Sequence, residues 1–147
     1  VFDDRRDKYF WGSEYFARKY VTDPPVHRYH YGVLLDMVGD AYLQLYQERN
    51  SMRWQDTRPL VEQIWNVARQ LGVSEFVPRK KHEVRDDHIP LHDIGRIPTC
   101  DIIDFDYRQR GTGRSLWHTT EDTPDKCSAL SLAKVGWVVL EWLKTLK

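Results

Sequence analysis

The hydrophobic residues of this chain form short continuous runs as well as longer stretches with helical spacing. The two clearest runs, residues 31–35 and 97–103, are mostly apolar, and Asp36 follows the first directly. Continuous apolarity is typical of strands that are covered on both faces. The shorter segments 43–46 and 76–77 predict two further extended pieces.

The clearest helical pattern lies in residues 57–71, where apolar residues recur every three or four positions. Asp56 or Thr57 is its expected cap, Pro59 fits its first turn and Gly72 follows its end. A last helix is predicted over residues 128–145. Its expected apolar face consists of Leu132, Val135, Val139 and Trp142.

The remaining segments complete a layered α/β prediction. Ser13 is the candidate N-cap of a short helix that ends at residue 20. Residues 50–56 read as a polar connection, and residues 1–9 as a charged, solvated loop. Buried strands that alternate with helices predict an α/β architecture built in layers.

Composition narrows the function classes. With 147 residues, 41% hydrophobic and 30% charged, the chain is long and apolar enough for one domain with a core. Its zero formal net charge gives no electrostatic case for nucleic acid as a partner, and no stretch is apolar enough to span a membrane. Cys100 reads as a small buried residue and Cys127 as free, which disfavours a cysteine zinc site. The chain begins at Val1 rather than Met, so we expect the natural start to be missing, and the compartment stays open.

Several carboxylates stand where α/β folds place their chemistry. Asp36 follows a predicted buried strand, at the sheet edge where ligands bind in such folds. The alternative is an ordinary turn or N-cap aspartate. Asp86 and Asp87 precede His88, and the alternative is a helix start with Asp87 as N-cap and Pro90 in the first turn. His88 is expected to orient these carboxylates rather than to bind metal.

His118 is the best candidate metal ligand. Neutral imidazole is a common zinc ligand whose second nitrogen needs an acceptor, and Glu121 and Asp122 are close in sequence. The alternative is an ordinary loop histidine. The other histidines lack metal-ligand spacing and are expected on the surface or in packing. Residues 108–115 are rich in arginine and glycine but do not match a phosphate loop, so we expect a flexible surface loop.

These segments together resemble the zinc aminopeptidase and glutaminyl cyclase superfamily. The resemblance rests on five motifs in family order across nearly the whole chain: Gly12-Ser13-Glu14-Tyr15-Phe16-Ala17, Leu34-Leu35-Asp36-Met37-Val38-Gly39, Asp86-Asp87-His88-Ile89-Pro90, Trp117-His118-Thr119 and Asp122-Thr123. An aspartate pair before His-Ile-Pro, and a tryptophan before the metal histidine, favour glutaminyl-peptide cyclotransferases over aminopeptidases.

The resemblance implies a three-layer sandwich with a mixed, mostly parallel sheet. It implies that His118 binds zinc, that Asp36 and Asp87 belong to a catalytic hydrogen-bond network, and that Trp117 forms a wall of the substrate pocket. The implied acyltransferase reaction converts N-terminal glutamine of a peptide or protein to pyroglutamate and releases ammonia. In an aminopeptidase, which is a hydrolase, Asp36 would instead bind a second zinc.

The chain also departs from the family. It lacks an earlier zinc aspartate and a Gly-Glu-Glu motif that would end just before Val1. We therefore interpret residues 1–147 as one partial catalytic domain, the C-terminal half, with a partial zinc site and little or no activity alone. The insertion at residues 108–115 leaves the positions of Trp117 and His118 open.

Two alternatives remain at this stage. The chain could be a fragment of a zinc aminopeptidase, or a non-catalytic binding domain that keeps the fold. In either case a missing half would leave an unpaired strand edge, which favours association and lowers stability.

Overall fold

The computed structural model describes residues 9–146, so the predicted loop over residues 1–9 lies outside the described residues apart from Tyr9. The elements in chain order are α1 (Trp11–Thr22), β1 (Gly32–Asp36), β2 (Leu45–Glu48), α2 (Arg49–Arg53), α3 (Arg58–Gln70), β3 (Phe76–Lys81), α4 (His88–Asp93), β4 (Thr99–Ile103), a short 3₁₀ helix η1 (Pro124–Lys126) and α5 (Ala129–Leu143).

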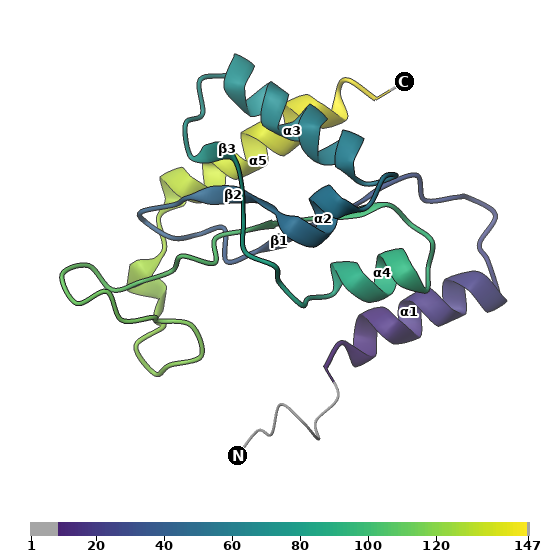
Figure 1. Cartoon of the computed structure of the whole chain (residues 1–147), viewed down its shortest axis with the longest axis horizontal. Coiled ribbons are helices and arrows are strands. Elements are labelled where there is room, and N and C mark those ends of the chain that lie inside the picture. The colour runs from purple at the N-terminus through teal and green to yellow at the C-terminus, as the bar shows by residue number, and fades with distance from the viewer. Residues whose placement is uncertain (1–8, 147) are drawn as a thin grey trace.

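The strands form a central layer between two layers of helices. β1 pairs in parallel with β4, β2 pairs in parallel with β3, and β2 lies beside β4. Helices α3 and α5 pack together on one side of the strands, and α1 packs with α4 on the other (Figure 1). The predicted α/β fold with parallel strands is therefore confirmed.

Helix α3 supplies much of the core and agrees closely with its predicted bounds. Its buried residues are Leu60, Val61, Ile64, Trp65, Val67 and Ala68. The helix begins after Thr57, has a proline in its first turn, and ends before Gly72, whose φ of 72° favours glycine. The indole N–H of Trp65 donates to the carbonyl of Val77 at 3.1 Å, which ties the helix to β3.

The β1–β4 pair carries functional candidates on adjacent strands. In its register Gly32 lies opposite Thr99 and Asp36 lies opposite Ile103. A Cβ at Gly32 would meet the Thr99 hydroxyl oxygen at 2.5 Å, so only glycine fits there. The prediction that this strand is covered on both faces was wrong, because none of its five residues is fully buried and Leu35 is 45% exposed.

Three local predictions need correction. Residues 50–56 are not only a connection, because the side chain of Glu48 accepts from the backbone of Asn50 and Ser51 and starts helix α2. Helix α1 begins at Trp11, so Ser13 lies inside it and is not its N-cap. On α5, Leu132 is exposed and Val138 is buried in its place, because the helix packs on α3 through a slightly different face.

Other predictions from composition agree with the structure. Cys100 is fully buried, and Cys127 is free and exposed. Among the described residues, no helix combines the length and the apolarity that a membrane crossing requires.

Candidate active site

A pocket of about 390 Å³ lies where the segments after β1, β3 and β4 meet. It brings together three of the predicted site residues, Asp36, Trp117 and His118. The full lining is Tyr9, Phe10, Asp36, Glu83, Val84, Arg85, Asp86, Ile103, Phe105, Trp117 and His118. The pocket thus combines carboxylates with an aromatic wall.

The acidic part of the pocket is a pair of carboxyl groups. Asp36 is the last residue of β1, and Asp86 lies in the turn before α4. Burial, the charge of Asp86 and a side-chain hydrogen bond with Asp86 raise the pKa of Asp36 above its ordinary value. Asp36 therefore keeps its proton to a higher pH than an isolated aspartate would, with the Asp86 carboxyl group in hydrogen-bond contact with it.

The structure places Asp87 differently from Asp86. Asp87 is the N-cap residue of α4, as the helix-start alternative predicted, although its side chain makes no capping bond. Instead its Oδ1 accepts a hydrogen bond from the hydroxyl of Ser13 at 2.6 Å, which links α4 to α1. Asp87 is absent from the pocket lining, and Asp86 is the functional candidate that the sequence reasoning did not select. The signal was available, because an N-cap assigned to Asp87 leaves Asp86 in the preceding turn.

Trp117 and His118 form the opposite wall. Their rings stack at 3.8 Å, and the ring of Phe105 lies 5.6 Å from that of Trp117. His118 has a φ of 59°, a left-handed conformation that is uncommon outside glycine. The expected partners of His118 are engaged elsewhere, since Asp122 accepts from the Tyr107 hydroxyl at 2.7 Å and Glu121 lies 3.9 Å from Arg114.

The insertion that precedes Trp117 is a surface hairpin. Arg108 and Ser115 form an antiparallel bridge, and Gly111 and Gly113 have positive φ. The backbone N–H of Leu116 donates to the carbonyl of Tyr107 at 3.2 Å. The insertion therefore folds back on itself and returns the chain to the pocket with Trp117 and His118 on its wall.

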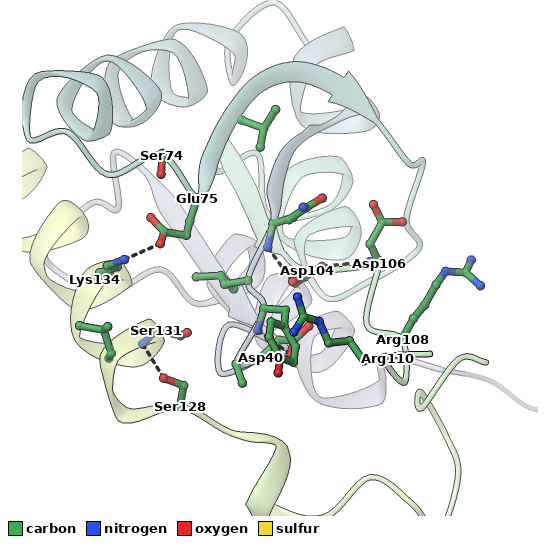
Figure 2. A pocket seen from close by; sticks show the side chains of 16 residues that line it. Asp40, Ser74, Glu75, Asp104, Asp106, Arg108, Arg110, Ser128, Ser131 and Lys134 are labelled. Atoms are coloured by element: carbon green, nitrogen blue, oxygen red, sulfur yellow. Dashed lines mark hydrogen bonds and ion pairs between the residues drawn. The ribbon is translucent and has the colours of Figure 1, made fainter. Parts of the chain in front are cut away.

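A second, larger cleft of about 710 Å³ contains none of the predicted site residues (Figure 2). Its acidic groups are already engaged. Glu75 pairs with Lys134, Asp104 accepts from the backbone of Gln44 at 2.8 Å, and Asp106 bonds with His82 at 3.1 Å. Arg108 and Arg110 also line this cleft. Each of these three carboxylates has at least one partner within the protein, and the predicted site residues lie in the smaller pocket, so the smaller pocket is the better candidate for chemistry.

The residues present do not complete a metal site. Within residues 9–146 no group of three or more His, Cys, Asp or Glu side chains is arranged to hold a metal ion. A catalytic zinc usually has three protein ligands.

The remaining histidines lie outside the candidate pocket, on the surface or in packing contacts. His27 and His30 are exposed, and His82 bonds with Asp106. His92 stacks on Trp54 at 3.8 Å. His88 is fully buried and does not line the pocket.

Comparisons with known proteins place this geometry in a family. A model described as peptidase family M28 matches residues 3–143. The chain belongs to peptidase family M28. The predicted family resemblance is thereby confirmed. A comparison with curated proteins gave no match for this M28 chain.

Solved structures similar to this M28 chain fall into two groups. A glutaminyl cyclase from Fimbriiglobus ruber is 39% identical with a TM-score of 0.83, over 96% of this chain and 45% of that one. A glutaminyl cyclase from Porphyromonas gingivalis is 29% identical with a TM-score of 0.80, over 98% and 51%. A Zn-dependent exopeptidase from Parabacteroides distasonis is 31% identical with a TM-score of 0.83, over 99% and 49%. The chain spans about half the length of these relatives.

Proposed function

We propose that this M28 chain is the C-terminal half of the catalytic domain of a glutaminyl-peptide cyclotransferase. The reaction would convert an N-terminal glutamine of a peptide or protein to pyroglutamate with release of ammonia. The observation that carries the proposal is the Asp36–Asp86 carboxyl pair, which faces Trp117 and His118 across one pocket. The likeness to two glutaminyl cyclases supports it.

The carboxyl pair suits the substrate amine. The carboxyl groups of Asp36 and Asp86 would attract and orient the α-amino group, while Trp117 and Phe105 would enclose the glutamine side chain. In the reaction the α-amine nitrogen forms a bond to the δ-carbon of the side-chain amide, the bond from that carbon to the amide nitrogen breaks, and a proton passes from the amine to the leaving ammonia. Ring closure within one residue depends mainly on orientation, which a tight pocket provides.

Asp87 takes a supporting part in this proposal. Its hydrogen bond from Ser13 would hold α1 and α4 together, so that Asp86 keeps its place in the pocket. This assigns to Asp86 the place in the catalytic hydrogen-bond network that the resemblance implied for Asp87.

For zinc, this chain offers only part of a binding site. Relatives are described as Zn-dependent, and His118 is the ligand that we propose from this chain. The described residues alone do not fit a complete zinc site, so the roles given above belong to protein groups only. The other ligands would have to come from residues outside 9–146.

A zinc aminopeptidase is the second candidate, because the relatives include Zn-dependent exopeptidases and a leucine aminopeptidase precursor. The same carboxyl pair would bind the amine of any N-terminal residue. A non-catalytic binding domain is the third, favoured by the lack of a three-ligand cluster within residues 9–146.

The products separate these candidates. The complete reading frame that contains this chain would be expressed, supplied with zinc and given peptides with N-terminal glutamine. Pyroglutamate with equimolar ammonia is expected; a free amino acid would indicate the aminopeptidase, and neither product would indicate a binding domain.

Two adjacent variants test the site itself. Asp86→Asn is expected to lower kcat/KM by roughly 100-fold or more, because it replaces a pocket carboxyl group that faces the substrate amine with an amide that cannot exchange a proton. Asp87→Asn, which keeps a group able to accept from Ser13, is expected to lose less than about tenfold. The reverse order of the two effects would contradict the assignment of Asp86 to the pocket.

A further inference from the structure

Three titratable side chains from three elements meet in the core behind the pocket. Glu48 ends β2, His88 is the first residue of α4, and Asp101 lies in the middle of β4. Their exposed fractions are 2%, 0% and 1%. We call Glu48, His88 and Asp101 the buried triad. Such groups are costly to bury unless they are paired, so their arrangement requires a physical explanation.

Glu48 is the fixed end of the triad. Its Oε1 accepts from the backbone N–H of Asn50 at 2.9 Å and of Val84 at 3.1 Å, and its Oε2 accepts from the backbone N–H and the hydroxyl of Ser51 at 2.7 and 2.9 Å. Burial alone would raise the pKa of Glu48, but the facing His88 ring and these backbone donors outweigh it and lower the pKa to about 2. Glu48 is therefore an ionised group that can only accept hydrogen bonds.

His88 lies between the two carboxyl groups. Its Nε2 is 3.5 Å from Oε2 of Glu48, and its Nδ1 is 3.7 Å from Oδ2 of Asp101. Among the described residues, neither ring nitrogen and neither Asp101 oxygen has a hydrogen-bond partner at normal distance. Buried polar atoms are nearly always paired, so we take the nearest oxygen of each carboxyl group as the partner of the ring nitrogen that faces it.

The ionised state of Glu48 fixes the positions of the protons on His88 and Asp101. Because Glu48 only accepts, Nε2 of His88 must carry the proton that faces it. In a neutral ring Nδ1 is then bare and can accept a proton from a carboxylic acid. Burial and the nearby carboxylates of Asp86, Glu48, Asp36 and Asp87 raise the pKa of Asp101 to about 9. Asp101 is thus a neutral acid at pH 7 and can donate to Nδ1.

We propose that Glu48 and His88 are positioning residues for the candidate active site. Glu48 fixes His88 in the tautomer with the proton on Nε2, and Nδ1 of His88 holds the acid proton of Asp101. Ionised carboxylate, imidazole and proton donor stand in the same order as in a serine-hydrolase triad, although no nucleophile is involved. With its proton held on the His88 side, Asp101 adds no negative charge near the Asp36–Asp86 pair, whose charges act on Asp101. This last consequence rests on the proposed function.

The tautomer of His88 can be measured directly. Long-range proton–nitrogen correlation spectra of the ¹⁵N-labelled chain at pH 7 distinguish the two neutral tautomers and the doubly protonated ring. The ring signals of His88 are assigned in the wild-type chain through their correlations with the backbone signals of residue 88. We expect a neutral ring with the proton on Nε2. A proton on Nδ1, or a doubly protonated ring, would overturn the proposal, and this result needs no variant of the triad to fold.

One variant tests each end of the triad. Glu48→Gln keeps the shape but offers an amide donor, so the population of His88 should shift toward the Nδ1-protonated tautomer. Glu62→Gln, an exposed change on α3, is the matched control and should leave the His88 signals unchanged. Asp101→Asn retains a donor toward Nδ1 and should keep the wild-type tautomer. An unchanged tautomer in folded Glu48→Gln, or a changed one in folded Asp101→Asn, would refute the scheme.

The spectra require neither zinc nor substrate. Failure of the cyclisation assay would therefore leave the triad intact, and failure of the triad would leave the proposed reaction untouched.

Discussion

Replacement of Gly32 by alanine should destabilise the fold strongly for a single methyl group. The added Cβ would meet Oγ1 of Thr99 at 2.5 Å, Cγ2 at 2.8 Å and Cβ at 3.1 Å. Thr99 is fully buried, and its hydroxyl donates to the carbonyl of Ile97 at 2.8 Å. The side chain cannot rotate away without breaking that bond, so β1 and β4 must separate.

The cost has two parts. An overpacked methyl group in a dense core costs roughly 1–3 kcal/mol. Loss of the Thr99 hydrogen bond adds about 0.5–1.5 kcal/mol. The reduced freedom of the unfolded chain returns roughly 0.5 kcal/mol. We therefore expect Gly32→Ala to lower the free energy of unfolding by about 1–4 kcal/mol.

Urea unfolding followed by circular dichroism measures this change, provided that the m-value is unaltered. Gly136→Ala is the matched control, because Gly136 is an exposed interior position of α5 with nothing within 4 Å of an added Cβ. It should raise stability by about 0.5–1 kcal/mol through helix propensity. Adding Thr99→Ala should recover part of the Gly32→Ala loss. Equal stability of Gly32→Ala and wild type would refute the argument from the β1–β4 contact.

Three further predictions concern exposure, charge and the strand edge. In the native chain a thiol reagent should modify Cys127 alone, because burial encloses Cys100 and raises its pKa; two rapidly reacting thiols would contradict the burial of Cys100. Asp101 binds its proton up to a pKa of about 9 when folded but only to about 4 when unfolded, so it contributes stability at low pH that is lost as pH rises between these values. The stability of Asp101→Asn relative to wild type, measured by urea unfolding, should therefore be greater at pH 8 than at pH 5. An identical dependence of stability on pH in the two proteins would refute this. The isolated chain should associate through β1 and melt at low temperature, and Leu35→Lys should reduce that association in sedimentation velocity; a cooperative, high-melting monomer would contradict this.

Local patterns were enough for much of the fold. The apolar spacing of α3, with Pro59 at its start and Gly72 after its end, specifies that helix whatever it packs against. The runs that became β1 and β4 were predicted as strands from their continuous apolarity, although only β4 is fully buried. The ordered motifs around Asp36, Asp86–His88 and Trp117–His118 were enough to indicate the family that residues 3–143 match.

Properties that depend on neighbours distant in sequence needed the tertiary structure. Helix α2 exists because buried Glu48 caps it while also bonding Val84, and no periodicity records that contact. Adjacent Asp86 and Asp87 are equivalent in sequence, and only the packing of α1 on α4 turns Asp87 to Ser13 and leaves Asp86 beside Asp36. The sequence by itself determined the long helices and the main strands, because those depend on spacing along the chain. The tertiary structure decided which carboxyl groups meet, because a charge and its partner are selected by distance in space.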